Sequence, residues 1–496
     1  MRFRIQPREV EIPEQDPFRN DLLGRQEPAE VLTHMLRSIE GPCVLAVDAP
    51  WGAGKTTFLN MLARHLRNQE FPVVEFNAWE TDFTSDPFLA LSEELTNGVR
   101  EYTVGPLSDE IEKVKSAAKD VVRLAVPSVI RLATAGILDI SPLIEREAGQ
   151  ALASFAKKRL SEYLDARTSL QAFRASLGEF ATRLAESKRN RPLIVVIDEL
   201  DRCRPSYAVE LLETAKHLFM VDGIVFVLAV NRSELAHSIR AVYGGEFDAL
   251  GYLRRFFDID FYLPDAKRRP FIEETLRAAG ITDYFRNRSR SRTLGDNYES
   301  IRNWLVELFS GSDLSLRRIA QAIHRLGLTY ASLPKNSPSL ALAATTAAVM
   351  RTLNPNLYGR FMRREAEDRE AIEHLISRGP RPEGSEIDHY LEAVIIVAAM
   401  ELRNPGRDLF GVDPSPLLAE YHEEADRARQ SGDNDAAATR ARSIIGIIGQ
   451  IRDSSLLGHG GLGFEEAARR LELLSPSLIG EEEEEEEERS DDGRGN

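Results

Sequence analysis

Residues 43–62, CVLAVDAPWGAGKTTFLNML, decide the fold of this chain of 496 residues. The stretch begins with a continuous apolar run at 43–47, which has the length of a strand and no polar face. Such a run is typical of a parallel strand that is buried on both sides. A glycine-containing loop follows, and apolar residues then recur at helical spacing from Phe58 to Leu66. The stretch therefore predicts a buried strand, a tight loop and a helix in direct succession.

The loop between this strand and helix matches the phosphate-binding loop pattern, except that Ala49 replaces its first glycine. Gly52 and Gly54 let the backbone curl so that successive N–H groups point at one anion, and the helix adds its positive end. Lys55 is expected to bridge the β- and γ-phosphates, and the Thr56 hydroxyl to bind Mg²⁺. The residues expected to hold the nucleotide are Pro50, Trp51, Gly52, Ala53, Gly54, Lys55, Thr56 and Thr57.

A second wholly apolar strand, Leu193 to Ile197, ends in Asp198 and Glu199. Acidic residues at the end of a buried strand are costly unless they coordinate something. Asp198 is therefore expected to hold the Mg²⁺ through water, and Glu199 to orient and polarise the attacking water. A small-molecule kinase needs no water-activating glutamate at this place, so the acid pair favours hydrolysis. The alternative is an ordinary charged turn after a strand.

Three further side chains are candidates near the γ-phosphate, and each has a structural alternative. Asn231 follows the apolar run 225–230 and is expected either to bond the γ-phosphate or the lytic water, or to cap its strand. Arg255 either reaches a γ-phosphate across a subunit interface, or lies at a helix C-terminus, where cations are favoured. Arg317 either reaches back to the nucleotide from the helical half or is an exposed arginine of an amphipathic helix.

The order of strands and helices predicts the architecture. Strand signals lie at 43–47, within 72–79, and at 192–200, 223–231 and 256–263, with helix patterns between them. This alternation predicts an α/β sandwich around a parallel sheet. Residues 100–190 read mostly as long helices and are expected to interrupt the sheet as an insertion. After Pro264 helical periodicity continues to about Leu473, so the rest of the chain is expected to be all-α.

Charge and composition exclude several classes of protein. Half of the net charge of −16 lies in residues 481–496, which are expected to form a disordered, solubilising tail, with a specific binding role as the alternative. The acidic balance disfavours nucleic acid, and the basic clusters at 286–292 and 360–364 are expected to be solvated surface. Two distant cysteines indicate no disulfide framework and a reducing cytoplasm. No apolar run reaches the roughly 20 residues of a transmembrane helix, so the chain is expected to be soluble.

The chain resembles the KAP family of P-loop NTPases in five ordered blocks that cover roughly residues 17–330. The blocks are PWGAGKTTFLNML (50–62), FNAWE (76–80), IDELDRCRPSYAVELLE (197–213), VFVLAVNRSEL (225–235) and YLRRFFDIDFYLP (252–264). The resemblance implies a P-loop core with strand order 5-1-4-3-2, a helical lid that carries Arg317, and ATP as the nucleotide. Many members carry membrane-spanning helices in the insertion, but here charges such as Arg131 and Glu145 interrupt it.

The resemblance also bears on domains and function. The expected parts are an N-terminal arm (1–16), a KAP-type NTPase domain (17–265), a lid (266–330), a helical module (331–480) and the acidic tail (481–496). The site residues predict a Mg²⁺-dependent ATPase that couples its nucleotide state to conformational change or assembly. Because bacterial members of the family are similar to proteins of phage exclusion and defence, the resemblance implies a role in a bacterial anti-phage defence system. The alternatives are a slow-turnover switch or scaffold, and an ATPase stimulated by nucleic acid. Protein partners from the same operon or pathway are expected, and the chain is expected to form a homo-oligomer.

The family pattern also contains an Asp-Arg pair after the two acids, here Asp201 and Arg202. Asp201 is expected to form an ion pair with Arg202 rather than to join the metal ligands.

Overall fold

The computed structural model divides the chain into two compact units, one of residues 10–266 and one that begins at Lys267. The structure describes residues 10–39, 41–84, 86–103, 106–124, 150–286, 298–333, 338–376, 386–405, 413–431, 435–455 and 463–473. The predicted disorder of residues 481–496 falls outside these ranges, as does most of the predicted N-terminal arm. The finer division into core, lid and helical module stays a prediction.

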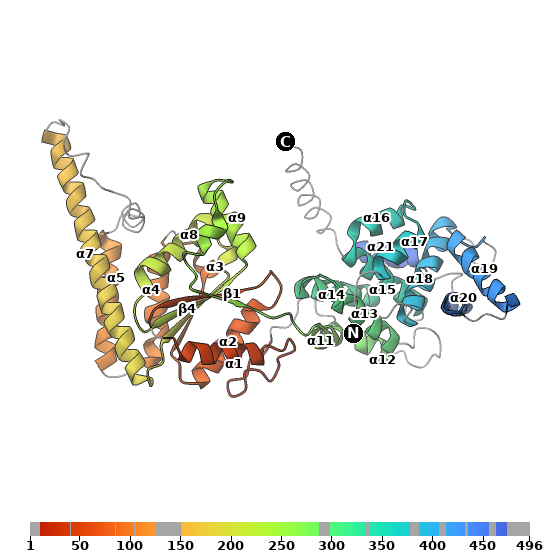
Figure 1. Ribbon diagram of the computed structural model, residues 1–496, viewed down its shortest axis with the longest axis horizontal. Helices are drawn as coiled ribbons and strands as arrows, with labels where there is room; N and C mark the ends of the chain where they lie inside the picture. Colours follow the sequence, from red (N-terminus) through yellow and green to blue (C-terminus); the bar gives the residue numbers. More distant parts are fainter. Residues whose placement is uncertain are drawn as a thin grey trace. The chain divides into compact units, whose positions relative to one another are not determined.

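A five-stranded parallel sheet forms the centre of the first unit (Figure 1). Its strands are β1 (Cys43–Asp48), β2 (Val73–Asn77), β3 (Leu193–Asp198), β4 (Ile224–Val230) and β5 (Ile259–Tyr262). The order across the sheet is β2-β3-β4-β1-β5, which is the predicted order 5-1-4-3-2 read from the other edge. The α/β fold and all five predicted strands are therefore confirmed.

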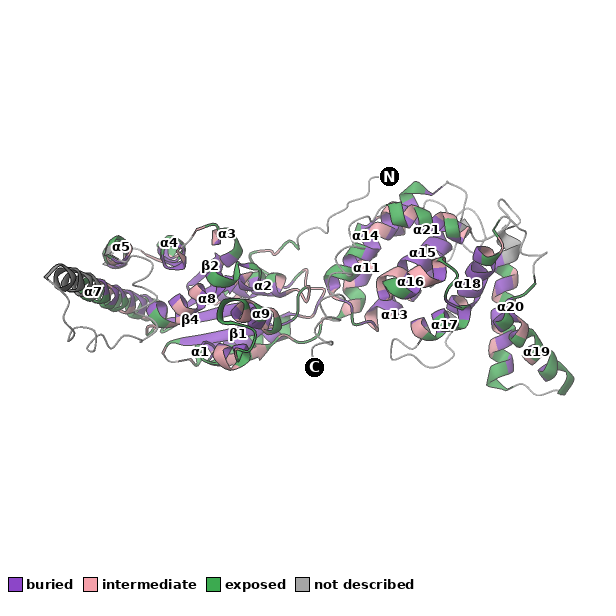
Figure 2. Ribbon diagram, turned by 90° about the horizontal axis from the view of Figure 1, so that it is seen from above, coloured by how far each residue is buried: buried purple, intermediate pink, exposed green. Residues whose placement is uncertain are grey.

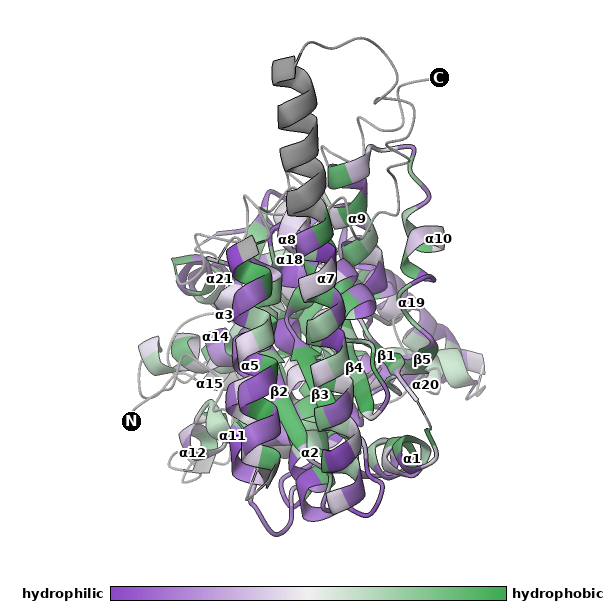
Figure 3. Ribbon diagram, turned by 90° about the vertical axis from the view of Figure 1, so that its left-hand side faces the viewer, coloured by the Kyte–Doolittle hydropathy of each residue, from purple (hydrophilic) through white to green (hydrophobic). Residues whose placement is uncertain are grey.

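Helices cover both faces of the sheet because each strand alternates its apolar side chains between two cores. In β1, Val44 and Ala46 belong to one core, and Leu45 and Val47 belong to the other. Against the core of Leu45 pack α1 (Gln26–Arg37) and α2 (Lys55–Asn68). Against the opposite core pack α4 (Pro87–Gly98), α8 (Pro205–Thr214) and α9 (Arg232–Tyr243). Figure 3 shows the hydrophobic strands between helices with hydrophilic outer faces.

The predicted insertion is helical in nearly all of its described residues. Helices α5 (Pro106–Leu124) and α7 (Gln150–Ser187) lie side by side beside the core of the unit (Figure 1). Phe173 of α7 anchors them, because its ring packs edge-on against Phe88 of α4 at 5.0 Å and against Phe219 at 5.2 Å. Among the helices that the structure describes, none has the length and apolar character needed to cross a membrane.

The second unit contains helices and no strand within its described residues. They are α11 (Arg268–Ala278), α12 (Ile281–Arg286), α13 (Tyr298–Ser310), α14 (Leu316–Ser332), α15 (Pro338–Leu353), α16 (Pro355–Met362), α17 (Asp368–Ile376), α18 (Glu386–Arg403), α19 (Pro416–Ser431), α20 (Ala436–Ser455) and α21 (Phe464–Leu473). The all-α character predicted for this half is confirmed.

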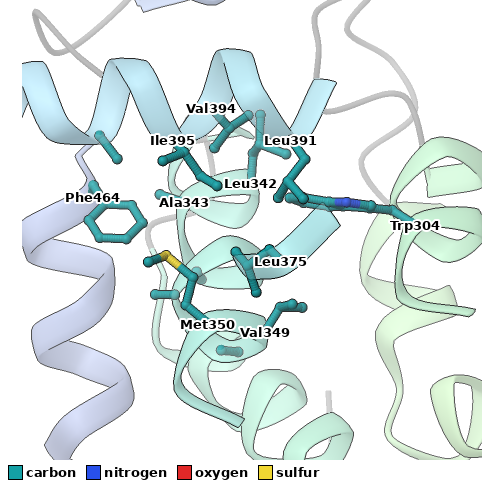
Figure 4. Close-up of a cluster of buried hydrophobic side chains, with 14 of the residues drawn as sticks. Trp304, Leu342, Ala343, Val349, Met350, Leu375, Leu391, Val394, Ile395 and Phe464 are labelled. Carbon is teal, nitrogen blue, oxygen red and sulfur yellow. The ribbon is translucent and has the colours of Figure 1, made fainter. Parts of the chain in front are cut away.

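Helix α15 is the centre of the second unit. It is apolar on nearly all sides, as expected of a helix that is surrounded by others. Figure 4 shows Met350 of α15 pointing toward Phe464 of α21, with Trp304 reaching in from α13. Figure 2 shows the same division in both units: buried residues line the strands and the inner helix faces, and exposed residues cover the outside.

Candidate functional site

Three strands of the sheet end side by side and bring the predicted site residues to one edge. Strand β4 lies between β1 and β3, and Asp48 at the end of β1 pairs with Val230 at the end of β4. The phosphate-binding loop follows β1, the acid pair ends β3, and Asn231 follows β4. Because parallel strands share their carboxyl edge, the loop, the acids and the amide are neighbours, which is where open α/β sheets bind ligands.

The two glycines of the loop have backbone conformations that other residues rarely adopt. Gly52 has φ of 76° and Gly54 has φ of 87°, both in the left-handed region. Gly54 also lies against Leu23, since a Cβ at this position would come within 2.9 Å of Leu23 Cδ1. The loop thus has the curled backbone that the sequence pattern predicts, and α2 begins directly after it at Lys55.

The Lys55 ammonium is buried and ties the loop to the segment after β3. It donates to the carbonyl oxygen of Ala49 at 2.7 Å and pairs with Asp201 Oδ2 at 3.6 Å. The same Asp201 oxygen accepts a hydrogen bond from Trp51 Nε1 at 2.8 Å. Asp201 therefore binds two residues of the loop, and its side chain is only 4% exposed.

The predicted pairing of Asp201 with Arg202 is wrong. Arg202 instead pairs with Glu199, with Nε 2.5 Å from Oε2. Residues Leu200–Arg202 form a short 3₁₀ turn, and Glu199 before it has φ of 61° in the left-handed region. The turn sends neighbouring side chains in different directions, so Asp201 faces the loop while Arg202 returns to Glu199.

Thr56 lies between the two acids that end β3. Its hydroxyl donates a hydrogen bond to Glu199 Oε1 at 3.3 Å, and it lies close enough to Asp198 to act on the pKa of that carboxyl. Burial raises the pKa of the Asp198 carboxyl, and Thr56 offsets part of the rise. The pKa of Glu199 is raised by burial first and then by the charge of Asp198. A cation bound here would lower the pKa of both carboxyls, since a nearby positive charge favours the charged carboxylates.

The chemistry of these groups fits Mg²⁺. The Thr56 hydroxyl and the Asp198 carboxylate are the hard oxygen ligands that this ion prefers. In the part of the chain that the structure describes, no three His, Cys, Asp or Glu side chains gather into a metal site. Mg²⁺ usually takes one or two protein ligands and completes its shell with water and phosphate oxygens.

The remaining predicted residues take different positions. Asn231 is buried at the end of β4, and its Oδ1 accepts a hydrogen bond from the Ser233 hydroxyl at 2.7 Å. Arg255 is exposed just after the short helix α10 (Ala249–Leu253). Arg317 is exposed in the first turn of α14 and belongs to the second unit. A nucleotide role for each of the three stays a prediction.

Two further arginines, Arg25 and Arg232, connect segments at this edge of the sheet, and the sequence did not point to either of them. Arg25 is only 1% exposed, and its guanidinium donates to the carbonyl oxygens of Ala53, at 2.8 Å, and of Pro264. It thereby ties the phosphate-binding loop to the chain that leaves β5. Arg232 pairs with Asp260, and its backbone N–H donates to Asp48 Oδ1 at 3.2 Å. No sequence signal distinguishes such residues, because most of their partners are backbone groups or lie far along the chain.

Both cysteine thiols are expected to be inert in the folded protein. Cys203 lies against the Glu199 carbonyl oxygen at 3.6 Å, and burial raises the pKa of its thiol to about 12. The pKa of the buried Cys43 thiol is raised as well. Since the thiolate is the reactive form, neither residue should react with an aromatic disulfide reagent at mildly alkaline pH, whereas both should react in guanidinium chloride. Rapid release of the coloured thiol by the native chain would contradict this expectation.

Comparison with known proteins places this geometry in a family. Residues 25–333 match the model of the KAP family P-loop domain. The phage T7 exclusion protein of Escherichia coli (strain K12) is 24% identical over 351 residues, which cover 64% of this chain and 42% of that protein. The chain thus spans about two fifths of the length of this relative.

Two solved structures are weakly similar to the chain. The ORC2 protein of Aeropyrum pernix in ADPNP–ADP complexes has 13% identity and a TM-score of 0.34, covering 90% of this chain and 97% of that one. Drosophila ORC bound to GC-rich DNA and Cdc6 has 11% identity and a TM-score of 0.30, with 91% and 69% covered. TM-scores this low say nothing about function. The family match, by contrast, spans more than half of the chain and contains the whole site, and the chain belongs to the KAP family of P-loop NTPases.

Proposed function

We propose that the chain is a Mg²⁺-dependent ATPase that couples hydrolysis to a conformational change or to assembly. Membership of a P-loop NTPase family supports the nucleotide. The observation that carries the proposal is the position of the Thr56 hydroxyl, which donates to Glu199 Oε1 at 3.3 Å and lies beside Asp198. Thr56 in the first turn of α2, Asp198 at the end of β3 and Glu199 directly after it therefore converge on one point, as phosphoryl transfer to water requires. ATP rather than GTP is inferred from the family.

Each residue at this point has a distinct task in the proposed reaction. Lys55 and the loop amides hold the β- and γ-phosphates, while Thr56 and Asp198 would hold the metal. When bound, Mg²⁺ neutralises charge on the phosphate oxygens. Glu199 orients the attacking water and accepts its proton, for which a pKa raised by burial is suited. Arg202 holds the other oxygen of Glu199 and fixes the carboxylate in place.

The test is phosphate release from ATP, measured with Mg²⁺ and with excess EDTA. Steady turnover that EDTA abolishes would support the proposal. Tight ATP binding with negligible turnover would instead identify a switch or scaffold. Titration with DNA and RNA in the same assay addresses stimulation by nucleic acid, which the net charge of −16 disfavours.

A role in phage defence is part of the proposal and rests on similarity alone. The relative with the matching region is named as a phage T7 exclusion protein, and it extends well beyond that region. We expect the helical second unit to bind protein partners, since no additional catalytic motif is recognisable there. The protein with Glu199→Gln, loaded with ATP and used as bait, would trap such partners if the nucleotide-bound state recruits them.

Specific ATPase activity is expected to rise with protein concentration if Arg255 acts between two copies of the chain. Arg255 is exposed, and an arginine supplied in trans stabilises charge in the transition state. The variant Arg255→Ala should therefore lose at least about tenfold in turnover at high protein concentration. Arg254→Ala is the matched control, because Arg254 is the adjacent exposed arginine. Turnover that is independent of concentration, or an equal loss in both variants, would remove the assignment.

A further inference from the structure

The buried carboxylate of Asp201 connects the turn after β3 to the phosphate-binding loop. Its Oδ2 atom accepts a hydrogen bond from Trp51 Nε1 at 2.8 Å and lies 3.6 Å from Lys55 Nζ. The Asp201 side chain is only 4% exposed. Hydrogen bonds to an ionised carboxylate are short and strong, so such a group holds its partners firmly. The proposed reaction uses Asp198 and Glu199 and gives Asp201 no task.

The Trp51 indole is a large side chain in the middle of the loop, and 45% of its surface is exposed. An indole has a single donor, Nε1–H, and here that donor meets the buried carboxylate. Because the ring is rigid, the bond fixes the backbone that carries it. On either side, Lys55 Nζ donates to the Ala49 carbonyl oxygen at 2.7 Å, and the Arg25 guanidinium to that of Ala53 at 2.8 Å. The loop is thus held at three alternate residues, and the carboxylate provides the central contact.

The Lys55 ammonium is directed by the same carboxylate. Lysine carries its charge on a flexible four-carbon stem with three rotatable donors, so it needs partners to hold one position. The Ala49 carbonyl oxygen and the Asp201 carboxylate are two such partners, and they leave donor capacity for a phosphate oxygen. Asp201 therefore restricts the direction in which Lys55 offers its remaining donor.

The turn that carries Asp201 also fixes the position of the glutamate in the proposed reaction. Glu199 directly precedes the 3₁₀ turn Leu200–Arg202, and the Leu200 side chain is fully buried. Asp201 thus ties the loop to Glu199 over a path of two residues. In the proposed reaction Lys55 holds the γ-phosphate and Glu199 holds the attacking water, so the rate depends on how the two are placed relative to each other.

We propose that Asp201 is a positioning residue of the nucleotide site, which orients the Lys55 ammonium and the Trp51 indole through one carboxylate oxygen. It acts through these two residues and contacts neither the nucleotide nor the metal. Its effect falls on the chemical step rather than on binding, because its negative charge also repels the phosphates. The inference rests on the proposed ATPase activity and deepens it by adding a residue that supports the site.

Asp201→Asn separates positioning from direct contact. The amide oxygen still accepts a hydrogen bond from Trp51, but the charge that pairs with Lys55 is gone. ATP turnover at saturation, kcat, is expected to fall roughly ten- to hundredfold, as misplacement of a reacting group does. Affinity for a slowly hydrolysed ATP analogue, measured by isothermal titration, should stay the same or rise. Unchanged turnover, or a loss of affinity as large as the loss of turnover, would overturn the proposal.

Asp82→Asn is the matched control for an effect of stability alone. Asp82 is also a buried aspartate that pairs with a cation, but its partner is Arg204, which lies 2.9 Å away and outside the loop. This variant should lower the melting temperature about as much as Asp201→Asn and keep its turnover. An equal fall of turnover in the two variants would show that Asp201 acts only through stability.

The indole signal of Trp51 tests the contact without any turnover. The chain has three tryptophans, so labelled tryptophan gives three indole N–H signals in a nuclear magnetic resonance spectrum, and Trp51→Phe identifies one of them. Asp201→Asn should move this signal to lower proton frequency, because a neutral acceptor replaces a carboxylate, and Asp82→Asn should leave it in place. A signal that ignores Asp201→Asn would overturn the positioning role. A parent chain that shows the shift but hydrolyses no ATP would instead contradict the proposed function and retain the loop contact.

Discussion

Lys55→Ala is expected to weaken ATP binding roughly ten- to hundredfold. An ammonium that bonds phosphate oxygens contributes about 1.5–3 kcal/mol to binding, and each 1.4 kcal/mol corresponds to about a factor of ten. The Lys55 ammonium is held by the Ala49 carbonyl oxygen and the Asp201 carboxylate, and these contacts position it at the loop. Isothermal titration with a slowly hydrolysed ATP analogue and Mg²⁺ measures the loss directly.

The same substitution is expected to destabilise the protein, so binding and folding need to be separated. Without Lys55, the buried Asp201 carboxylate keeps the Trp51 indole but loses its cation. Removing one partner of a buried ion pair costs about 3–5 kcal/mol, because the other charge stays buried without compensation. Adding Asp201→Asn to Lys55→Ala should restore much of the melting temperature and leave ATP affinity low. Recovery of both properties together would show that Lys55 acts only through stability, and unchanged affinity in Lys55→Ala would rule out its role in the site.

The fold was predictable because its strands are buried on both faces. The runs 43–47 and 193–197 contain only apolar residues, and such runs indicate strands of a parallel sheet. The order of the strands could be predicted only from the resemblance to a family, because hydrophobic periodicity does not show which strands are neighbours in the sheet. The phosphate-binding loop and the acid pair were predictable for a further reason: each lies at the end of a buried strand, and parallel strands end at one edge.

The contacts around the site were less predictable because they depend on local backbone geometry. Asp201 and Arg202 are adjacent in sequence, and adjacency suggested a pair. The left-handed conformation of Glu199 and the turn after it direct the two side chains to different partners. Arg25 shows the same limit, since the carbonyl oxygens that it binds are present in every residue. Backbone partners leave no trace in a sequence pattern.

Glu199→Gln is expected to lower ATP turnover about a hundred- to ten-thousandfold while ATP binding is retained. General base catalysis contributes about that factor, and an amide cannot accept the proton of water. The change is nearly isosteric, so the contact with the Thr56 hydroxyl at 3.3 Å and the packing around Arg202 should persist. Single-turnover phosphate release gives the rate of the chemical step, and titration of the ATP analogue gives the affinity.

Substitution of Arg202 tests whether this residue acts only by holding the Glu199 carboxylate in place. Arg202→Gln removes the cation 2.5 Å from Glu199 but keeps the carboxylate, so turnover should fall far less than in Glu199→Gln. Combining the two substitutions should cost no more than Glu199→Gln alone, because Arg202 acts through the glutamate that is already gone. A full additional loss in the double variant would mean that Arg202 acts on the nucleotide itself. Turnover that survives Glu199→Gln would place the base elsewhere and leave Glu199 a structural partner of Arg202 and Thr56.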